Sequence, residues 1–174
     1  DSLRAWWLHR MLATPYPLLE KMTLFWHGYF GVSNARVKSA ALMGRHLGLL
    51  RSHALGRFDA LLGAAVLDPA LLLSLEAGAQ RKAQPATDFA RAFLEDYTVG
   101  AGSFAENDVV ETARAFAGFF VEHGNLRVIE RERDGCPKTI LGRTGAWTAD
   151  DAARIALGAE ATPRRVVRAL FRWL

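Results

Sequence analysis

The 174-residue sequence contains a single cysteine, Cys136. One thiol cannot form an internal disulfide, and it cannot supply a cysteine-rich zinc module or a CxxC redox site. The sequence also lacks an uninterrupted apolar run near the roughly 18 residues that a membrane span needs. It contains no GxSxG, HExxH, phosphate-loop or GxGxxG motif, so common hydrolase and nucleotide-binding templates are unsupported. The fold must therefore depend on packing.

The composition is that of an ordinary globular protein, with 51% apolar and 23% charged residues. Its length predicts one helical domain over residues 1–174. Because the chain begins at Asp1 rather than Met, we expect it to be a fragment of a longer domain, with flanking segments of the same chain as its natural neighbours.

The net charge of +4 comes entirely from the C-terminal part of the chain. Residues 1–125 contain 12 basic and 12 acidic side chains, whereas residues 126–174 contain 10 basic and 6 acidic ones. This excess is smaller and less clustered than the basic stripe of a nucleic-acid-binding protein. It argues against nucleic acid as a partner.

Apolar residues recur at helical spacing through most of the chain, which predicts a mainly α fold, a multi-helix orthogonal bundle. Asp68 followed by Pro69, and Thr148 with Asp151 in a capping-box pattern, indicate two helix starts. A loop is expected over 76–86. The expected helices cover 3–11, 18–30, 37–66 with a break near Ser52, 70–75, 89–99, 107–120 and 162–174.

Strand-like segments at 126–132 and 138–141 flank the turn signal Asp134-Gly135. They predict one small β-hairpin near residues 126–142. The last expected helix carries arginines on one side and apolar residues on the other. A membrane-surface or partner-binding helix has this pattern. So has a surface helix whose apolar stripe packs on the domain, and we favour that interpretation.

His27 is the most interesting single residue, because it lies in the aromatic segment Phe25–Phe30 and needs a hydrogen-bond partner there. Glu20 lies two helical turns earlier on the same face. His27 is therefore a candidate general base held by a carboxylate, and it is the only candidate metal ligand that we single out. The simpler interpretation is a core histidine bound to a backbone carbonyl, and it is favoured.

The other candidates have simple structural explanations. Arg91 and Glu95 have the spacing of an intrahelical ion pair. The rest fit a helix junction, a helix start, a turn and a solvated surface, and they are His53, Asp108, Asp134 and Lys138. Glu95 joins His27 and Glu20 as a candidate catalytic residue, and the others are candidate binding residues. The sequence identifies no cofactor.

Taken together, several strings resemble the domain of unknown function 1800 family. The resemblance implies a largely helical domain, belonging to proteins that are longer on both sides. Because many relatives look exported, it also implies a cell-envelope location. The matching strings are Trp6-Trp7 with Arg10-Met11, Pro17-Leu18, Phe25-Trp26-His27, His53-Ala54-Leu55-Gly56, Asp68-Pro69-Ala70, Ala90-Arg91, Asp108-Val109, Ala113-Arg114-Ala115 and Lys138-Thr139 with Leu141-Gly142.

The chain departs from the family pattern at polar positions. Tyr29 replaces the second histidine of an FWHNHF string, and Arg133-Asp134 replaces a His-Asp pair. A PNEN run appears as Pro85-Ala86-Thr87-Asp88. If these positions form a metal or acid–base site in relatives, part of that site is missing here.

We therefore favour a non-enzymatic cell-envelope module that binds a protein or polysaccharide partner. The alternative is a hydrolase-like or metal-dependent enzyme with a degenerate His/Glu/Asp site around the 76–86 loop. It requires that His27 and Glu95 converge in one cleft. Nucleic-acid binding by the basic tail is the weakest hypothesis.

Overall fold

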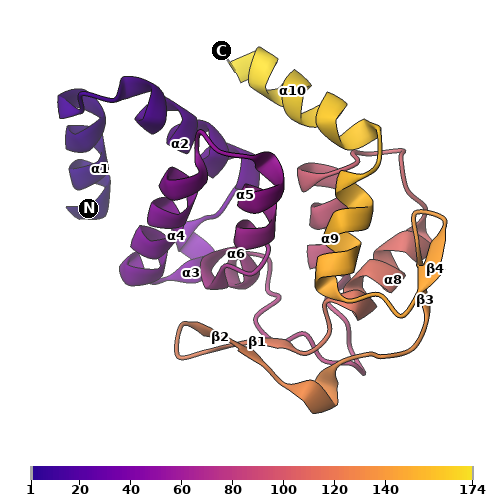
Figure 1. Cartoon of the computed structure of the whole chain (residues 1–174). Helices are drawn as coiled ribbons and strands as arrows, with labels where there is room; N and C mark the ends of the chain where they lie inside the picture. Colours follow the sequence, from indigo (N-terminus) through magenta and orange to yellow (C-terminus); the bar gives the residue numbers. More distant parts are fainter. Residues whose placement is uncertain (1, 174) are drawn as a thin grey trace. The chain divides into compact units, whose positions relative to one another are not determined.

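The structure is a computed structural model and describes residues 2–173. Ten α-helices and two β-hairpins lie within this part of the chain (Figure 1), so the predicted mainly α class is confirmed. The chain divides into two compact units, residues 1–74 and residues 75–174, here called unit 1 and unit 2. That the whole chain forms one domain stays a prediction.

The described residues of unit 1 form helices and their connecting loops, without a β-strand. Proline at the first position of the second helix and a left-handed Gly31 after its last residue set that helix's two ends. Ser39 caps the fourth helix, since its hydroxyl accepts the Leu42 N–H at 3.3 Å. The helices are α1 (Ser2–Ala13), α2 (Pro17–Phe30), α3 (Asn34–Val37), α4 (Ala40–His53), α5 (Phe58–Ala65) and α6 (Pro69–Ser74).

The core of unit 1 forms around Trp26 on α2. Its ring stacks on Phe58 of α5 at a centroid distance of 5.6 Å, and its indole N–H donates to the Ala54 carbonyl at 3.0 Å. The bond to Ala54 satisfies the polar atom of an otherwise apolar side chain. Trp26 therefore fixes α2 against the junction of α4 and α5, near the predicted helix break at Ser52.

Unit 2 combines helices with short strands. Its helical core packs Phe116 against Phe89 and Phe93 at centroid distances of 4.9 and 5.4 Å. The elements are α7 (Thr87–Ala92), the π-helical turn η1 (Phe93–Tyr97), α8 (Glu106–Ala115), β1 (Phe119–Glu122), β2 (Asn125–Val128), the 3₁₀ turn η2 (Glu130–Glu132), β3 (Lys138–Ile140), β4 (Arg143–Gly145), α9 (Ala149–Leu157) and α10 (Ala161–Trp173).

The β structure differs from the prediction in its pairing. β structure lies within 126–142, but 126–128 and 138–140 do not pair with each other. β2 pairs with β1 and β3 pairs with β4, each across a two-residue turn, His123-Gly124 and Leu141-Gly142. Both residues of each turn have positive φ, the geometry of the tight turns that match strand twist. Asp134-Gly135 lies between the two hairpins.

The helix expected over 107–120 also ends early. α8 stops at Ala115, and Phe119 and Phe120 belong to β1. Gly118 explains the change of direction, because its φ is +98° and a Cβ there would lie 2.6 Å from the Arg133 side chain. Only glycine fits both the backbone conformation and the close approach.

Replacing Phe116 by alanine tests the core of unit 2. Phe116 is fully buried, so Phe116→Ala is expected to lower the free energy of unfolding by about 3–5 kcal/mol. Chemical denaturation monitored by circular dichroism measures this change in the free energy of unfolding. Phe171→Ala is the matched control, since Phe171 is 84% exposed and its removal is expected to change stability by less than about 0.5 kcal/mol. Equal effects of the two variants would contradict the assignment of the core.

Candidate functional site

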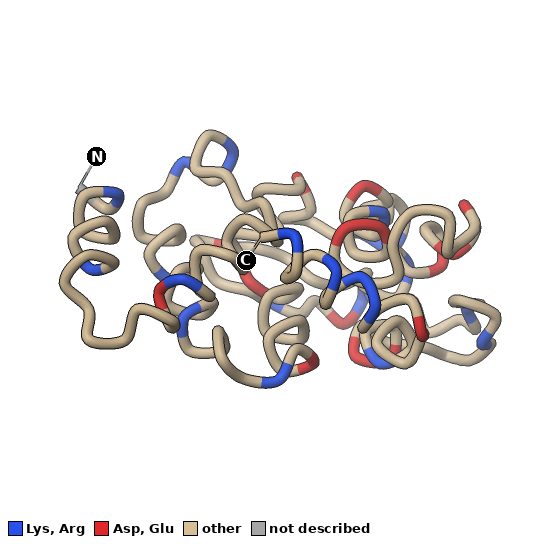
Figure 2. The backbone as a smooth tube through the Cα atoms, turned by 90° about the horizontal axis from the view of Figure 1, so that it is seen from above, with Lys and Arg blue, Asp and Glu red and all other residues tan. Residues whose placement is uncertain are grey.

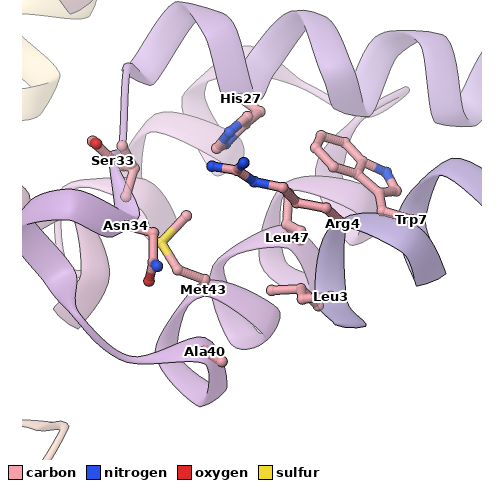
Figure 3. Close-up of a pocket in the computed structure, with 10 residues that line it drawn as sticks. Leu3, Arg4, Trp7, His27, Ser33, Asn34, Ala40, Met43 and Leu47 are labelled. Carbon is pink, nitrogen blue, oxygen red and sulfur yellow. The ribbon is translucent and has the colours of Figure 1, made fainter. Parts of the chain in front are cut away.

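Unit 1 contains a pocket of about 490 Å³ (Figure 3). Arg4 and Trp7 reach it from α1, and His27 reaches it from the last turn of α2. Ser33 and Asn34 border it where α3 begins. The remaining lining residues are apolar, and they are Leu3, Val32, Ala40, Met43 and Leu47. The volume lies within the range of small-molecule sites.

The polar groups of the pocket come from positions that the local structure fixes. Arg4 and Trp7 are one helical turn apart, which places both on one face of α1. Ser33 is the N-cap of α3, where its hydroxyl accepts the Ala35 N–H and its own N–H donates to the Ser74 hydroxyl. Figure 3 shows the Arg4 side chain extending toward His27. Arg4 is the one charged side chain among the lining residues, which gives the pocket a positive charge.

A buried histidine–aspartate pair lies next to His27. His46 of α4 is fully buried, and its Nδ1 is 2.6 Å from Oδ2 of Asp68, just before α6. A carboxylate accepts only, so Nδ1 donates and Nε2 is left as the basic nitrogen of the ring. This Nε2 has no hydrogen-bond partner. Asp68 thus orients His46 and fixes its tautomer.

The ring of His27 packs against an aromatic neighbour, but its Nδ1 has no hydrogen-bond partner. The ring makes an edge contact with Trp7 at 5.4 Å and lies 5.8 Å from the His46 ring, while Nδ1 is buried without a hydrogen bond. Burial is the main cause that lowers the pKa of His27 below its ordinary value, and the nearby His46 lowers it further. The pocket therefore holds a neutral imidazole near neutral pH. The simpler interpretation, a ring bound to a backbone carbonyl, is not met at Nδ1.

Glu20 does not form the pair with His27 that the sequence predicts. Its Oε1 accepts from Nε of Arg51 at 2.7 Å and from Nε of Arg10 at 3.1 Å. The reason is that α4 and α1 each bring a guanidinium to this buried carboxylate. Burial opposes ionisation of Glu20, but the two arginines outweigh it, so its pKa lies below the ordinary value. Glu20 borders a smaller pocket of about 260 Å³.

The candidates in unit 2 make structural contacts. Arg91 pairs with Glu106 rather than with Glu95, whose charge adds only a minor electrostatic effect. Asp108 accepts the backbone N–H groups of Ala105 at 2.8 Å and Leu141 at 2.7 Å, so it ties the start of α8 to the β3–β4 turn.

His53 of unit 1 closes α4, and its carbonyl accepts the Gly56 N–H at 2.9 Å. Glu95 belongs to unit 2 and His27 to unit 1. The convergence of all these groups in one cleft stays a prediction.

Asp134 and Lys138 form a buried ionic cluster with α8. Arg114 of α8 donates to Asp134 at 2.8 Å and also to Glu111 at 2.8 Å. Lys138 is almost fully buried, and its ammonium donates to the carbonyls of Asp134 and Cys136. Burial is the main cause that lowers the pKa of Lys138. This cluster fastens the segment between the two hairpins to α8.

His46 and Asp68 are the site residues that sequence reasoning missed. The Asp68-Pro69 pattern predicts only a helix start, and spacing alone gives His46 no partner. One signal was available, because His46 lies on the apolar face of α4, three residues after Met43 and four residues before Leu50. A polar ring at such a position requires a buried partner.

Within residues 2–173, neither a metal-binding cluster nor a membrane-spanning helix is found. No group of three or more histidine, cysteine, aspartate or glutamate side chains in this part of the chain is placed to hold a metal ion. His27 and His46 therefore offer a pair of nitrogens rather than a full ligand set. None of the described helices has the length and hydrophobicity to cross a membrane.

The chain matches the model of a protein family over residues 1–174, its whole length. The family is described as Protein of unknown function (DUF1800), and the chain belongs to it. This confirms the resemblance found in the sequence. No curated protein and no solved structure matches the chain significantly. A function must therefore be argued from the site itself.

The Asp134 cluster gives a prediction for stability against pH. Burial opposes ionisation of Asp134, but the bond from Arg114 outweighs it and lowers the pKa from 3.8 to about 2. An aspartate with a lowered folded-state pKa stabilises the fold above its unfolded-state pKa, and this contribution disappears as the pH falls from about 4 to about 2. We expect Asp134→Asn to lose about 2 kcal/mol at neutral pH and to show a flatter profile in that window.

Denaturant unfolding across pH 2–7 measures this effect. Glu160→Gln is the control, because Glu160 is exposed and its pair with Arg164 is a surface pair of little expected worth. Parallel wild-type and Asp134→Asn profiles would contradict the role of the cluster.

Proposed function

We propose that this protein is a non-enzymatic binding module of the cell envelope, and that the pocket of unit 1 binds an acidic sugar residue of a polysaccharide partner. The observation that carries the proposal is the lining of the pocket. It combines an arginine, a half-buried tryptophan, a neutral histidine and two small polar residues with an apolar remainder. The envelope location is supported by the resemblance of the sequence to a family with many exported relatives.

The charge in the pocket favours an anionic ligand. Arg4 supplies a guanidinium, whose planar fork of N–H groups matches a carboxylate in a bidentate arrangement. No lining residue carries a negative charge. His27 has a lowered pKa, so the attraction to an anion comes from Arg4 while His27 accepts or donates a hydrogen bond as a neutral ring.

The uncharged groups favour a sugar ring. The half-buried indole of Trp7 presents an apolar surface to the C–H face of a pyranose. Ser33 and Asn34 supply hydroxyl and amide groups for sugar hydroxyls. A concave site of this size encloses a small ring better than it matches a protein surface, which favours the polysaccharide over the protein partner.

Calorimetric titration with oligogalacturonate tests this function. We expect saturable binding to the wild-type protein and no comparable binding of a neutral oligoglucan. Trp7→Ala is expected to weaken binding at least about tenfold, since it removes the stacking surface. Trp6→Ala is the matched control, because Trp6 is outside this pocket. Arg4→Ala should weaken binding, whereas Arg57→Ala, which removes an exposed arginine elsewhere in unit 1, should not.

Equal binding of both oligosaccharides, or equal effects of Trp7→Ala and Trp6→Ala, would contradict the proposal. If neither sugar binds and the variants change nothing, the pocket is not a saccharide site.

The second candidate is a hydrolase-like or metal-dependent enzyme, and the histidine pair favours it. Asp68 fixes His46 with its Nε2 basic, and this atom and Nδ1 of His27 are both buried without partners. The two ring centroids are 5.8 Å apart. A water or metal ion held between the two nitrogens is the arrangement that this candidate requires. In this candidate His27 is the metal ligand or general base, and Glu20 and Glu95 are the carboxylates proposed from the sequence.

Metal analysis of the dialysed protein separates the two candidates. The enzyme candidate predicts about one zinc, iron or manganese ion per chain, lost in His27→Ala because a ligand is removed. His53→Ala is the control and should retain the metal, since His53 is outside the pair. Our preferred function predicts no stoichiometric metal in any of the three proteins. Metal that survives His27→Ala would contradict the role of His27.

A further inference from the structure

The C-terminal helix α10 separates its charges from its apolar residues. Residues 161–174 include four arginines and no acidic residue. At about 100° per residue, the apolar side chains occupy one arc of α10 and the arginines the adjoining arc. The apolar arc is made by Val166, Val167, Leu170, Phe171 and Trp173, and the basic arc by Arg164, Arg165, Arg168 and Arg172.

Only part of the apolar arc is used inside unit 2. Val166 is buried, and the buried Thr162 hydroxyl donates to the Ala156 carbonyl of α9 at 2.6 Å. By contrast, Val167 is 63% exposed and Phe171 is 84% exposed. The interpretation favoured from the sequence, a stripe that packs on the domain, therefore holds for Val166 and is wrong for Val167 and Phe171.

The arginines divide in the same way. Arg165 donates to the Asp96 carbonyl at 2.9 Å, and Arg164 pairs with Glu160 at 3.1 Å. Arg168 and Arg172 are exposed and make no ion pair within the described residues. Figure 2 shows basic positions in blue along the chain close to its C-terminus. Two uncompensated positive charges thus lie beside the exposed Val167 and Phe171.

We propose that α10 binds the surface of an anionic lipid bilayer. The helix would lie in the plane of the interface, with Val167 and Phe171 among the acyl chains and Arg168 and Arg172 at the phosphates. Large apolar residues beside a basic arc are the pattern of interfacial helices. Arginine side chains reach headgroups while their stems cover apolar surface.

The pairing of the two features favours a membrane over other partners. A polyanion such as nucleic acid uses the arginines but leaves Val167 and Phe171 in water. A neutral apolar protein groove uses these two residues but leaves the arginines without counter-charges. An anionic bilayer supplies an apolar layer and a negative surface side by side. The proposal is independent of the sugar pocket in unit 1.

Sedimentation with vesicles tests the proposal on the whole chain. We expect the protein to pellet with phosphatidylglycerol-containing vesicles at low salt and to remain in solution with pure phosphatidylcholine. Phe171→Ser is expected to weaken partitioning roughly tenfold, because it removes an apolar anchor. Arg168→Glu with Arg172→Glu is expected to weaken it by roughly a hundredfold, since each charge near the surface matters. All three substituted residues are exposed, so we expect the variants to fold like the wild type. Circular dichroism checks this.

Matched controls separate this effect from general stickiness and general charge. Val128→Ser removes another exposed apolar side chain of unit 2, and Arg131→Glu reverses another exposed arginine. Both should pellet like the wild type, as should the pocket variant Trp7→Ala. The proposal is overturned by equal binding to neutral vesicles, by α10 variants that match their controls, or by no pelleting at all. Self-association without lipid that Phe171→Ser abolishes would likewise overturn it, in favour of a protein contact.

Discussion

The hydrogen bond between His46 and Asp68 is the constraint on which the candidate site depends. With no disulfide possible, buried polar pairs and apolar packing hold the elements of unit 1 in place. This pair joins the middle of α4 to the residue before α6, and both side chains are buried. Removing one partner leaves the other without a hydrogen bond in an apolar surrounding, which costs more than the bond itself contributes. His46 of this pair also lowers the pKa of His27, in addition to the larger effect of burial.

The helical part of the fold was accessible from the sequence because its signals are local. Thr148 and Asp151 were predicted to form a capping box, and both of its hydrogen bonds are present at the start of α9. The break near Ser52 separates α4 from α5 as expected. The strands were located but their partners were not. The strands pair across the positive-φ turns at His123-Gly124 and Leu141-Gly142. The Asp-Gly pair at 134–135 is the more typical turn sequence, so the sequence predicts the turn there instead.

The site was less accessible, because it depends on contacts between distant segments. Helical spacing placed Glu20 and His27 on one face, but it said nothing of Arg10 and Arg51, which reach Glu20 from two other helices. Asp68 was visible only as a cap, whereas its partner lies 22 residues earlier. Spacing rules act within one element. A carboxylate binds whichever donor the tertiary fold brings nearest. The sequence therefore identifies His27 as a candidate but not the contacts around it, the His46–Asp68 pair and the bonds of Glu20 to two arginines.

Cys136 is a natural site for attaching a spectroscopic label. It is the one thiol of the chain and its residue is exposed, yet its backbone is fixed on both sides. Its N–H donates to Asp134, and its carbonyl accepts from the Lys138 ammonium. A maleimide dye therefore attaches at a single known position without any engineered cysteine. Because the attachment point is anchored to the Arg114 cluster, the dye's rotational freedom reports how well ordered that part of unit 2 is.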